Sequence, residues 1–132
     1  MTSNFRRVFK PRLIVFILVL ALFSTPAFAA HKHPEKWYQD IWCEIEGGQT
    51  EVIMADGTRC DCLTKTHAVE FDFGKKWAEA IGQALCYSMQ TGKRAGIVLI
   101  LEEKGDQKYW QRLNTIIKHH KLPIDTWKMK GY

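Results

Sequence analysis

The sequence predicts a mixed α/β (α+β) domain, because stretches typical of strands and of helices follow one another in a definite order. Three short strand-like stretches come in succession and are joined by turn signals. A long helical stretch follows them, and then comes the unbroken apolar run 96–101, as in a strand that is covered on both faces. We therefore expect an αβββαβ core with one further helix and one further strand at its C-terminal end.

Residues 1–29 are expected to be an export signal that precedes a single domain over residues 30–132. Four basic residues accompany an unbroken apolar run over 13–23, and Ala27-Phe28-Ala29 is a small-x-small cleavage site. The apolar run is shorter than the roughly 20 residues that a membrane-spanning helix needs, so we expect no stable membrane insertion after cleavage. The sequence thus predicts an exported protein, either periplasmic or secreted.

The basic excess of the whole chain comes from this signal. The chain has 19 Lys and Arg against 14 Asp and Glu, and four of the basic residues but no acidic one lie within residues 1–29. The domain that remains is close to neutral. It has no global attraction for nucleic acid, so any contact with nucleic acid must come from a local patch.

A first helix is expected between Pro34, which suits a first helical position, and the Gly47-Gly48 stop. Its apolar residues at helical spacing are Trp37, Ile41 and Ile45. Glu44 comes seven positions after Trp37, so we expect it to share the buried face of this helix.

The remaining elements are placed by turn and stop signals. Strands are expected over 51–54, 58–63 and 68–73, the first two joined by an Asp-Gly hairpin turn. The clearest helix is expected over 75–90, and its small residues Ala78, Ala80, Gly82 and Ala84 would let it approach a sheet closely. The later elements are a strand over 96–101, a helix over 106–120 and a short strand over 124–129.

The turn 64–67 sets the register of the second and third strands. If it closes symmetrically, Asp61 lies opposite Glu70, and Arg59 lies opposite Asp72 on the same face. Directly opposed carboxylates repel each other and need a compensating cation or a shared proton. A hard divalent cation such as Mg²⁺ suits an all-oxygen pair of this kind.

The helix after the third strand carries a polar stripe. Lys76, Glu79, Gln83 and Tyr87 stand at positions i, i+3, i+7 and i+11, so they share one face of the helix. Because the helix begins just after the strand that carries Glu70, we expect the stripe to face the carboxylates. It would bring a cation and two hydrogen-bonding groups to them.

Taken together, these residues resemble the PD-(D/E)XK nuclease superfamily, in particular its RecB-like branch. The likeness covers about residues 44–101 and rests on the αβββαβ order, the two strand carboxylates and the QxxxY motif from Gln83 to Tyr87. The resemblance implies a restriction-endonuclease-like fold that hydrolyses phosphodiester bonds in nucleic acid with Mg²⁺ or Mn²⁺. It implies metal ligands at Asp61 and Glu70, substrate-binding residues at Gln83 and Tyr87, and a first-helix acid at Glu44.

The third strand departs from the pattern of this family. The motif should read Glu-x-Lys, but here it is Glu70-Phe71-Asp72. Lys76, one turn into the following helix, is the candidate for the displaced catalytic lysine. Asp72 is either a third metal ligand or a partner of Arg59. If no cation reaches the site, the fold binds without catalysis, and a catalytically inactive binding or assembly module in the periplasm is the alternative function.

Cysteines and a group of basic residues leave further alternatives. One or two disulfides are expected in an oxidising compartment, and a bridge from Cys60 or Cys62 to Cys43 is favoured over one between Cys60 and Cys62. A small structural protein stapled by disulfides, with its carboxylates on the surface, is a third interpretation.

The basic residues near the fourth strand and the last helix are Lys93, Arg94, Lys104, Lys108 and Arg112. We interpret them as a solvated face, with a track for phosphates as the alternative.

Overall fold

The strands form one five-stranded mixed sheet in the order β1-β2-β3-β4-β5, as seen in a computed structural model that describes residues 30–131. The first three strands pair antiparallel, and β3, β4 and β5 run parallel. The helices and strands are α2 (Glu35–Ile45), β1 (Gln49–Ile53), β2 (Arg59–Leu63), β3 (His67–Phe73), α3 (Trp77–Thr91), β4 (Arg94–Leu101), α4 (Gln107–His120) and β5 (Ile124–Lys130). Two 3₁₀ turns, η2 (Gly74–Lys76) and η3 (Lys104–Asp106), lead into α3 and α4. The predicted class and the predicted order of helices and strands are confirmed, whereas the predicted export signal over residues 1–29 lies outside the described residues.

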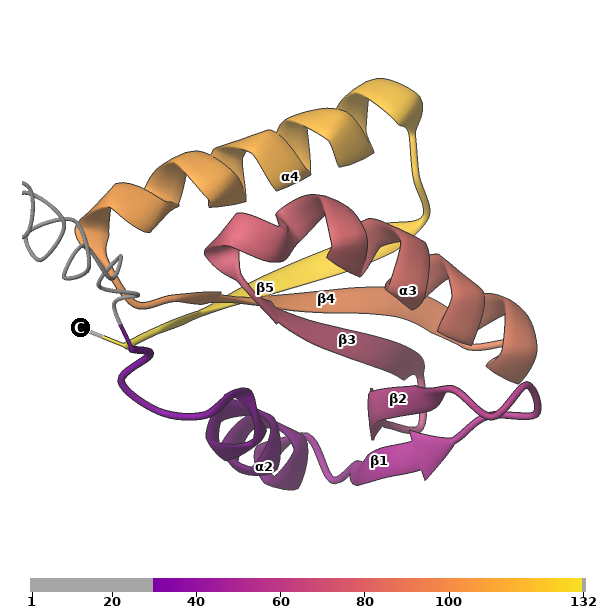
Figure 1. Cartoon of the computed structure of the whole chain (residues 1–132). Coiled ribbons are helices and arrows are strands. Elements are labelled where there is room, and N and C mark those ends of the chain that lie inside the picture. The colour runs from indigo at the N-terminus through magenta and orange to yellow at the C-terminus, as the bar shows by residue number, and fades with distance from the viewer. Residues whose placement is uncertain (1–29, 132) are drawn as a thin grey trace, which may run out of the picture. The chain divides into compact units, whose positions relative to one another are not determined.

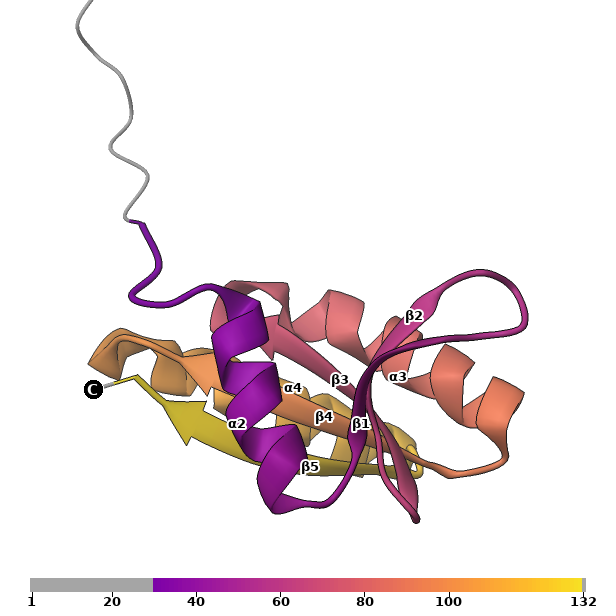
Figure 2. The same cartoon turned by 90° about the horizontal axis from the view of Figure 1, so that it is seen from below.

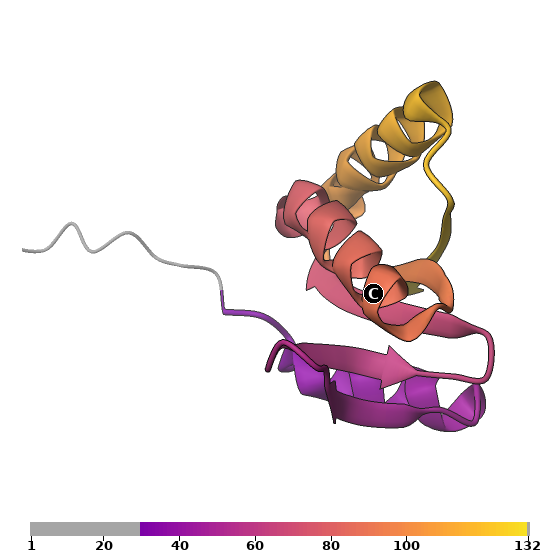
Figure 3. The ribbon, with the colours of Figure 1, turned by 90° about the vertical axis from the view of Figure 1, so that its right-hand side faces the viewer.

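The helices divide between the two faces of the sheet. α3 and α4 lie on one face and α2 lies on the other (Figures 1 and 3). Viewed from below, α2 lies across the lower face (Figure 2). The connections β3-α3-β4 and β4-α4-β5 step along the sheet in the same direction, so the usual handedness of parallel crossovers puts both helices on one side.

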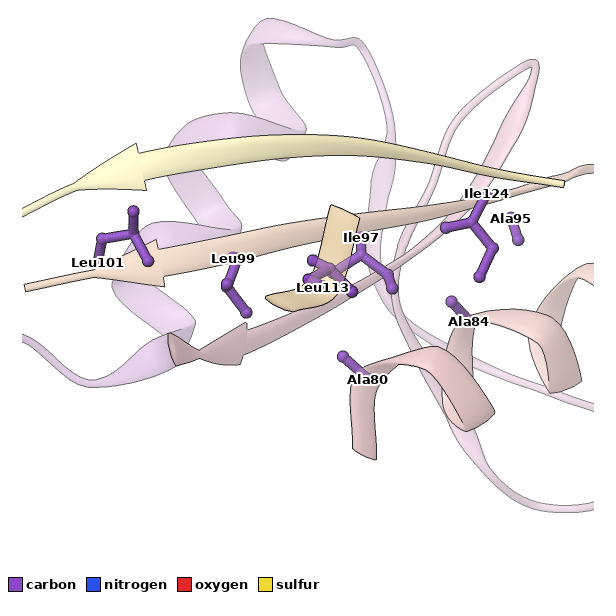
Figure 4. Close-up of a cluster of buried hydrophobic side chains, with 8 residues drawn as sticks. All are labelled: Ala80, Ala84, Ala95, Ile97, Leu99, Leu101, Leu113 and Ile124. Atoms are coloured by element: carbon purple, nitrogen blue, oxygen red, sulfur yellow. The ribbon is translucent and has the colours of Figure 1, made fainter. Parts of the chain in front are cut away.

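β4 forms the centre of the core. Ile97, Leu99 and Leu101 pack toward α3 and α4, whereas Val98 and Ile100 pack toward α2. The prediction that this strand is covered on both faces is therefore confirmed. The alanines of α3 that meet β4 are Ala80 and Ala84 (Figure 4). Ala78 and Gly82 are exposed instead, so only two of the four small residues serve the packing of α3 on the sheet.

The first helix buries a different face from the predicted one. Its buried residues are Tyr38, Gln39 and Cys43, whereas Trp37 and Ile45 are 43% and 77% exposed and Glu44 is exposed. The apolar spacing misleads here because aromatic packing and a disulfide, rather than the isoleucines, attach α2 to the sheet. Pro34 is the N-cap of the helix and not its first residue.

The disulfide joins Cys43 in α2 to Cys62 in β2, which is one of the pairings that the sequence left open. Gly48 lies close to this bridge, since a Cβ atom there would come within 2.8 Å of both sulfurs. Cys60 is a buried free thiol, and Cys86 is a free thiol on α3. The bridge therefore ties the helix on one face of the sheet directly to a strand.

Two of the basic residues near the fourth strand and the last helix form hydrogen bonds within the fold. Lys93 donates hydrogen bonds to the carbonyl oxygens of Thr64 and Lys65. Arg94 donates to both carboxylate oxygens of Asp125, at 2.8 and 3.0 Å.

Among the helices within residues 30–131, none is long and apolar enough to cross a membrane.

Candidate functional site

An acidic cavity of about 310 Å³ opens where β2 leaves β3. Leu63 pairs with Ala68, as symmetric closure of the turn requires, and the recorded pairing of these strands ends one residue further along. Beyond this point the Asp61 carboxylate accepts a hydrogen bond from the backbone N–H of Phe71 at 2.7 Å. A side chain thus takes over the bond that a strand backbone would otherwise make. The residues that line the acidic cavity are Glu35, Gln39, Glu51, Arg59, Asp61, Glu70, Phe71, Asp72, Lys76, Glu79, Gln83 and Tyr87.

Asp61 and Glu70 form a coupled carboxyl pair in this cavity. Glu70 is only 4% exposed, and its Oε2 atom has no hydrogen-bond partner. Burial raises the pKa of both groups, and a hydrogen bond between the two carboxyl groups together with the charge of Asp61 raises the pKa of Glu70 further. Without a cation, the pair therefore retains a proton at neutral pH.

Asp72, two positions after Glu70 on β3, is also buried and faces the start of α3. Burial raises its pKa to about 7, against the influence of the Lys76 ammonium, whose Nζ atom lies 4.0 Å from Asp72 Oδ1. Asp72 also accepts a hydrogen bond from the N–H of Phe73 at 3.1 Å. Of the two roles that the sequence left open for Asp72, the pairing with Arg59 is not formed, because Arg59 pairs with Glu51 on the neighbouring strand at 3.0 Å.

The predicted polar stripe of α3 lies along one wall of the acidic cavity. Glu79, Gln83 and Tyr87 line it from α3, as their helical spacing indicates. Lys76 also lines it, but as the last residue of η2 and not from one turn into the helix. Tyr87 is buried, and burial together with the charge of Glu70 raises its pKa to about 12. The Gln83 side chain hydrogen bonds with Tyr87, while its buried Oε1 atom has no partner.

The first-helix acid at the cavity is Glu35 and not Glu44. Glu44 lies on the exposed side of α2, whereas Glu35 and Gln39 line the acidic cavity. Burial raises the pKa of Glu35, against the charge of Lys76 and a hydrogen bond from Gln39 Nε2 at 3.1 Å. Glu35 and Gln39 precede Cys43 by eight and four positions, so the disulfide cysteine marks the helical face on which they stand.

One further acidic residue of the cavity was missed by sequence reasoning. Glu51 lines the cavity from β1, with its backbone in the left-handed region at φ 57°. A non-glycine residue there is strained by about 1 to 2 kcal/mol, and this local distortion has no signal in the residue pattern. Its partner Arg59 lines the same wall. Altogether six carboxyl-bearing residues and two basic residues surround the cavity.

The buried side-chain acceptors that lack partners point to one kind of occupant. Within residues 30–131, the buried side-chain polar atoms without a hydrogen bond are Gln39 Oε1, Glu70 Oε2 and Gln83 Oε1, and all three residues line the acidic cavity. All three atoms are acceptors, which a hydrated cation satisfies. No three His, Cys, Asp or Glu side chains in the described range already stand close enough to hold a metal ion. Mg²⁺ needs only one or two carboxylates, because it keeps several of its waters.

Comparison of the chain with protein-family models, with curated proteins and with solved structures gave no match.

Proposed function

We propose that this protein is an exported, metal-dependent nuclease that hydrolyses phosphodiester bonds in nucleic acid, with Asp61 and Glu70 holding Mg²⁺ or Mn²⁺. The observation that carries the proposal is the set of three unpartnered acceptor oxygens around the coupled carboxyl pair. Buried acceptors without partners cost about 1 to 3 kcal/mol each. A cation with its bound waters removes this cost and replaces the proton that the pair otherwise retains.

The residues around the pair have the chemistry that such a reaction needs. A bound Mg²⁺ or Mn²⁺ would polarise a phosphate oxygen and lower the pKa of a water molecule. Lys76 supplies positive charge at the same cavity and would stabilise negative charge that develops on the phosphate. Gln83 and Tyr87 offer an amide and a hydroxyl group for positioning the substrate, and Glu35 takes the place that the resemblance gave to Glu44.

The proposed location of the protein rests on two features. Residues 1–29 have the composition of an export signal. The Cys43–Cys62 disulfide is typical of a protein that resides in an oxidising compartment, because cytosolic thiols are kept reduced.

The second candidate is a catalytically inactive binding or assembly module. Two observations favour it: Asp72 replaces the lysine of the family motif, and the six carboxyl-bearing residues around the cavity outnumber the two basic residues. Without a bound metal ion, the negative charge of such a cavity repels a phosphate group. The two candidates share the fold, and they differ in whether metal binding leads to cleavage.

The first experiment is a cleavage assay on the exported protein produced from the full-length sequence. Supercoiled plasmid, linear duplex DNA, single-stranded DNA and RNA are incubated with Mg²⁺, Mn²⁺ or EDTA. We expect cleavage only with metal, and we expect Asp61→Asn and Glu70→Gln to lower its rate by roughly two orders of magnitude or more. Glu44→Gln is the matched control and is expected to cleave normally, because Glu44 lies on the exposed side of α2.

A Mn²⁺ titration of the same proteins separates the candidates. Mn²⁺ binding that needs Asp61 and Glu70, without cleavage of any substrate by the folded protein, would support the inactive module. Normal cleavage by Glu70→Gln would remove this cavity from consideration as the active site.

A further inference from the structure

A second hollow lies on the other side of the start of α3. It measures about 320 Å³ and is bounded by α3 and α4. We call it the α3–α4 groove, and its lining residues are Trp77, Lys108, Gln111, Arg112, Thr115 and Ile116. Trp77 directly follows Lys76, which lines the acidic cavity. Gly74 holds the start of α3 against α4, because a Cβ atom there would lie 2.9 Å from the Tyr109 ring. The two hollows are thus neighbours, separated by the first turns of α3.

The α3–α4 groove has the opposite charge from the acidic cavity. Its lining contains two basic residues, Lys108 and Arg112, and no carboxylate. Both cations lie over the Tyr109 ring, at 4.9 and 5.7 Å from its centroid, and within residues 30–131 neither forms an ion pair. An anionic chain is repelled by the metal-free cavity but attracted to the groove. The Trp77 indole adds an aromatic surface on which a base can stack.

Two small residues lie on the surface of α3 between the two hollows. Ala78 and Gly82 are exposed there, one turn apart. No atom lies within 4 Å of a Cβ atom built on Gly82, and its backbone is not in the left-handed region, so neither packing nor conformation requires glycine. A glycine within a helix costs about 0.5 to 1 kcal/mol relative to alanine. The missing side chain leaves room for a ligand backbone to cross the helix.

We propose that a single strand of nucleic acid crosses α3 over Ala78 and Gly82, with a base on Trp77 and phosphates beside Lys108 and Arg112. The next phosphodiester along the strand then reaches the acidic cavity. This proposal rests on the proposed nuclease function and names the substrate class. A single strand fits better than a duplex because a base must leave its stack to lie on an indole in a hollow of this size.

Binding is tested without metal, so that no cleavage occurs. The exported protein is titrated in EDTA against a fluorescein-labelled single-stranded oligonucleotide and against the duplex of the same sequence, at several salt concentrations. Two phosphate contacts to a single strand contribute a salt slope of about 1.4. We expect Lys108→Ala/Arg112→Ala to lower the slope by about this amount and the affinity at least about tenfold. Lys36→Ala/Lys65→Ala removes two exposed charges, one on α2 and one in the turn before β3, and is the matched control, with affinity expected to change less than about twofold.

A substitution on this surface of α3 tests the path itself. Gly82→Gln adds a neutral side chain and favours the helix, so a loss of binding cannot arise from unfolding. We expect it to weaken single-strand binding at least about tenfold. Wild-type affinity in both Gly82→Gln and Lys108→Ala/Arg112→Ala, or equal use of the groove by duplex, would overturn the proposal. Single-strand binding through the groove without any cleavage would instead refute the nuclease function and leave this path standing.

Discussion

Three carboxyl groups of the acidic cavity make the metal-free protein sensitive to pH. Burial raises the pKa of Asp61, Glu70 and Asp72, and that of Asp72 moves from its ordinary value of 3.8 to about 7. From about pH 4 upward the folded protein therefore binds more protons than the unfolded chain. The stability that these groups contribute is complete below this range and is lost as the pH rises through their folded pKa values.

We accordingly expect the metal-free protein to be more stable at pH 5 than at pH 8. Urea unfolding in EDTA at the two pH values measures the difference. Glu70→Gln should raise the free energy of unfolding at pH 8 by about 1 to 4 kcal/mol, because the neutral amide can be buried as it is, whereas the Glu70 carboxyl must take up a proton when the chain folds. Glu44→Gln should leave it unchanged. Equal stability of the wild-type protein at both pH values would show that these carboxyl groups are not buried together.

Most site residues could be predicted from the sequence because they depend on local geometry. The turn between β2 and β3 closes as predicted and directs Asp61 and Glu70 into one cavity, although the strand pairing ends at Cys62 and Val69. The helical period lines up Glu79, Gln83 and Tyr87 on α3. Their functional roles remain a prediction. The rest of the cavity lining depends on features that periodicity does not contain.

At the scale of elements, the attachment of α2 decides which of its carboxyl groups reaches the cavity. Its Tyr38 and Cys43 face the sheet, whereas the apolar spacing of Trp37 and Ile45 predicted a different face. Strands and crossover helices were predictable because their apolar residues form long, regular patterns. A short helix held by one disulfide and a few aromatic contacts was not, since its orientation depends on distant partners.

The Cys43–Cys62 bridge is therefore expected to matter for both stability and metal binding. It closes a loop with a sequence separation of 19. Replacing both cysteines by serine should lower the free energy of unfolding by about 3 kcal/mol. It should also weaken Mn²⁺ binding about tenfold, since Glu35 and Gln39 stand on the helix that the bridge holds in place. Urea unfolding and a Mn²⁺ titration measure the two effects.

The control for the bridge is Cys86→Ser, which alters a free thiol on α3. It should leave both the free energy of unfolding and the Mn²⁺ affinity close to those of the wild-type protein. Full Mn²⁺ affinity in the double cysteine variant would mean that α2 keeps its position without the disulfide.

At the scale of the whole molecule, the first described residues and the end of β5 meet at one buried carboxylate. Glu102 accepts hydrogen bonds from the backbone N–H of Lys32 at 2.9 Å and from the Tyr38 hydroxyl at 3.1 Å, and His31 Nδ1 lies 2.7 Å from it. Lys32 also donates its ammonium to the carbonyl of Gly131 at 3.1 Å. The start of the described chain and its C-terminal end lie side by side (Figure 1).

This junction reaches the candidate site through His31, whose ring stacks on Phe73 at 3.5 Å between centroids. Phe73 directly follows Asp72 and precedes the turn that leads into α3. Burial by itself raises the pKa of Glu102. The hydrogen bonds from His31 and Tyr38 lower the pKa by more than burial raises it, so the pKa lies below its ordinary value of 4.5. The contribution of Glu102 to stability thus has the opposite pH dependence from that of the carboxyl groups in the acidic cavity, and it is lost in acid.

We expect Glu102→Gln to lower the free energy of unfolding at pH 7 by about 1 to 3 kcal/mol, because the amide loses the charge-assisted bonds and one acceptor atom. The difference from wild type should shrink as the pH falls below about 4, where the wild-type carboxylate takes up a proton. Urea unfolding across this range measures both effects, with the exposed Glu44→Gln as the matched control. A variant as stable as wild type at pH 7 would mean that the start of the domain is held by ring stacking on Phe73 and Trp37 rather than by Glu102.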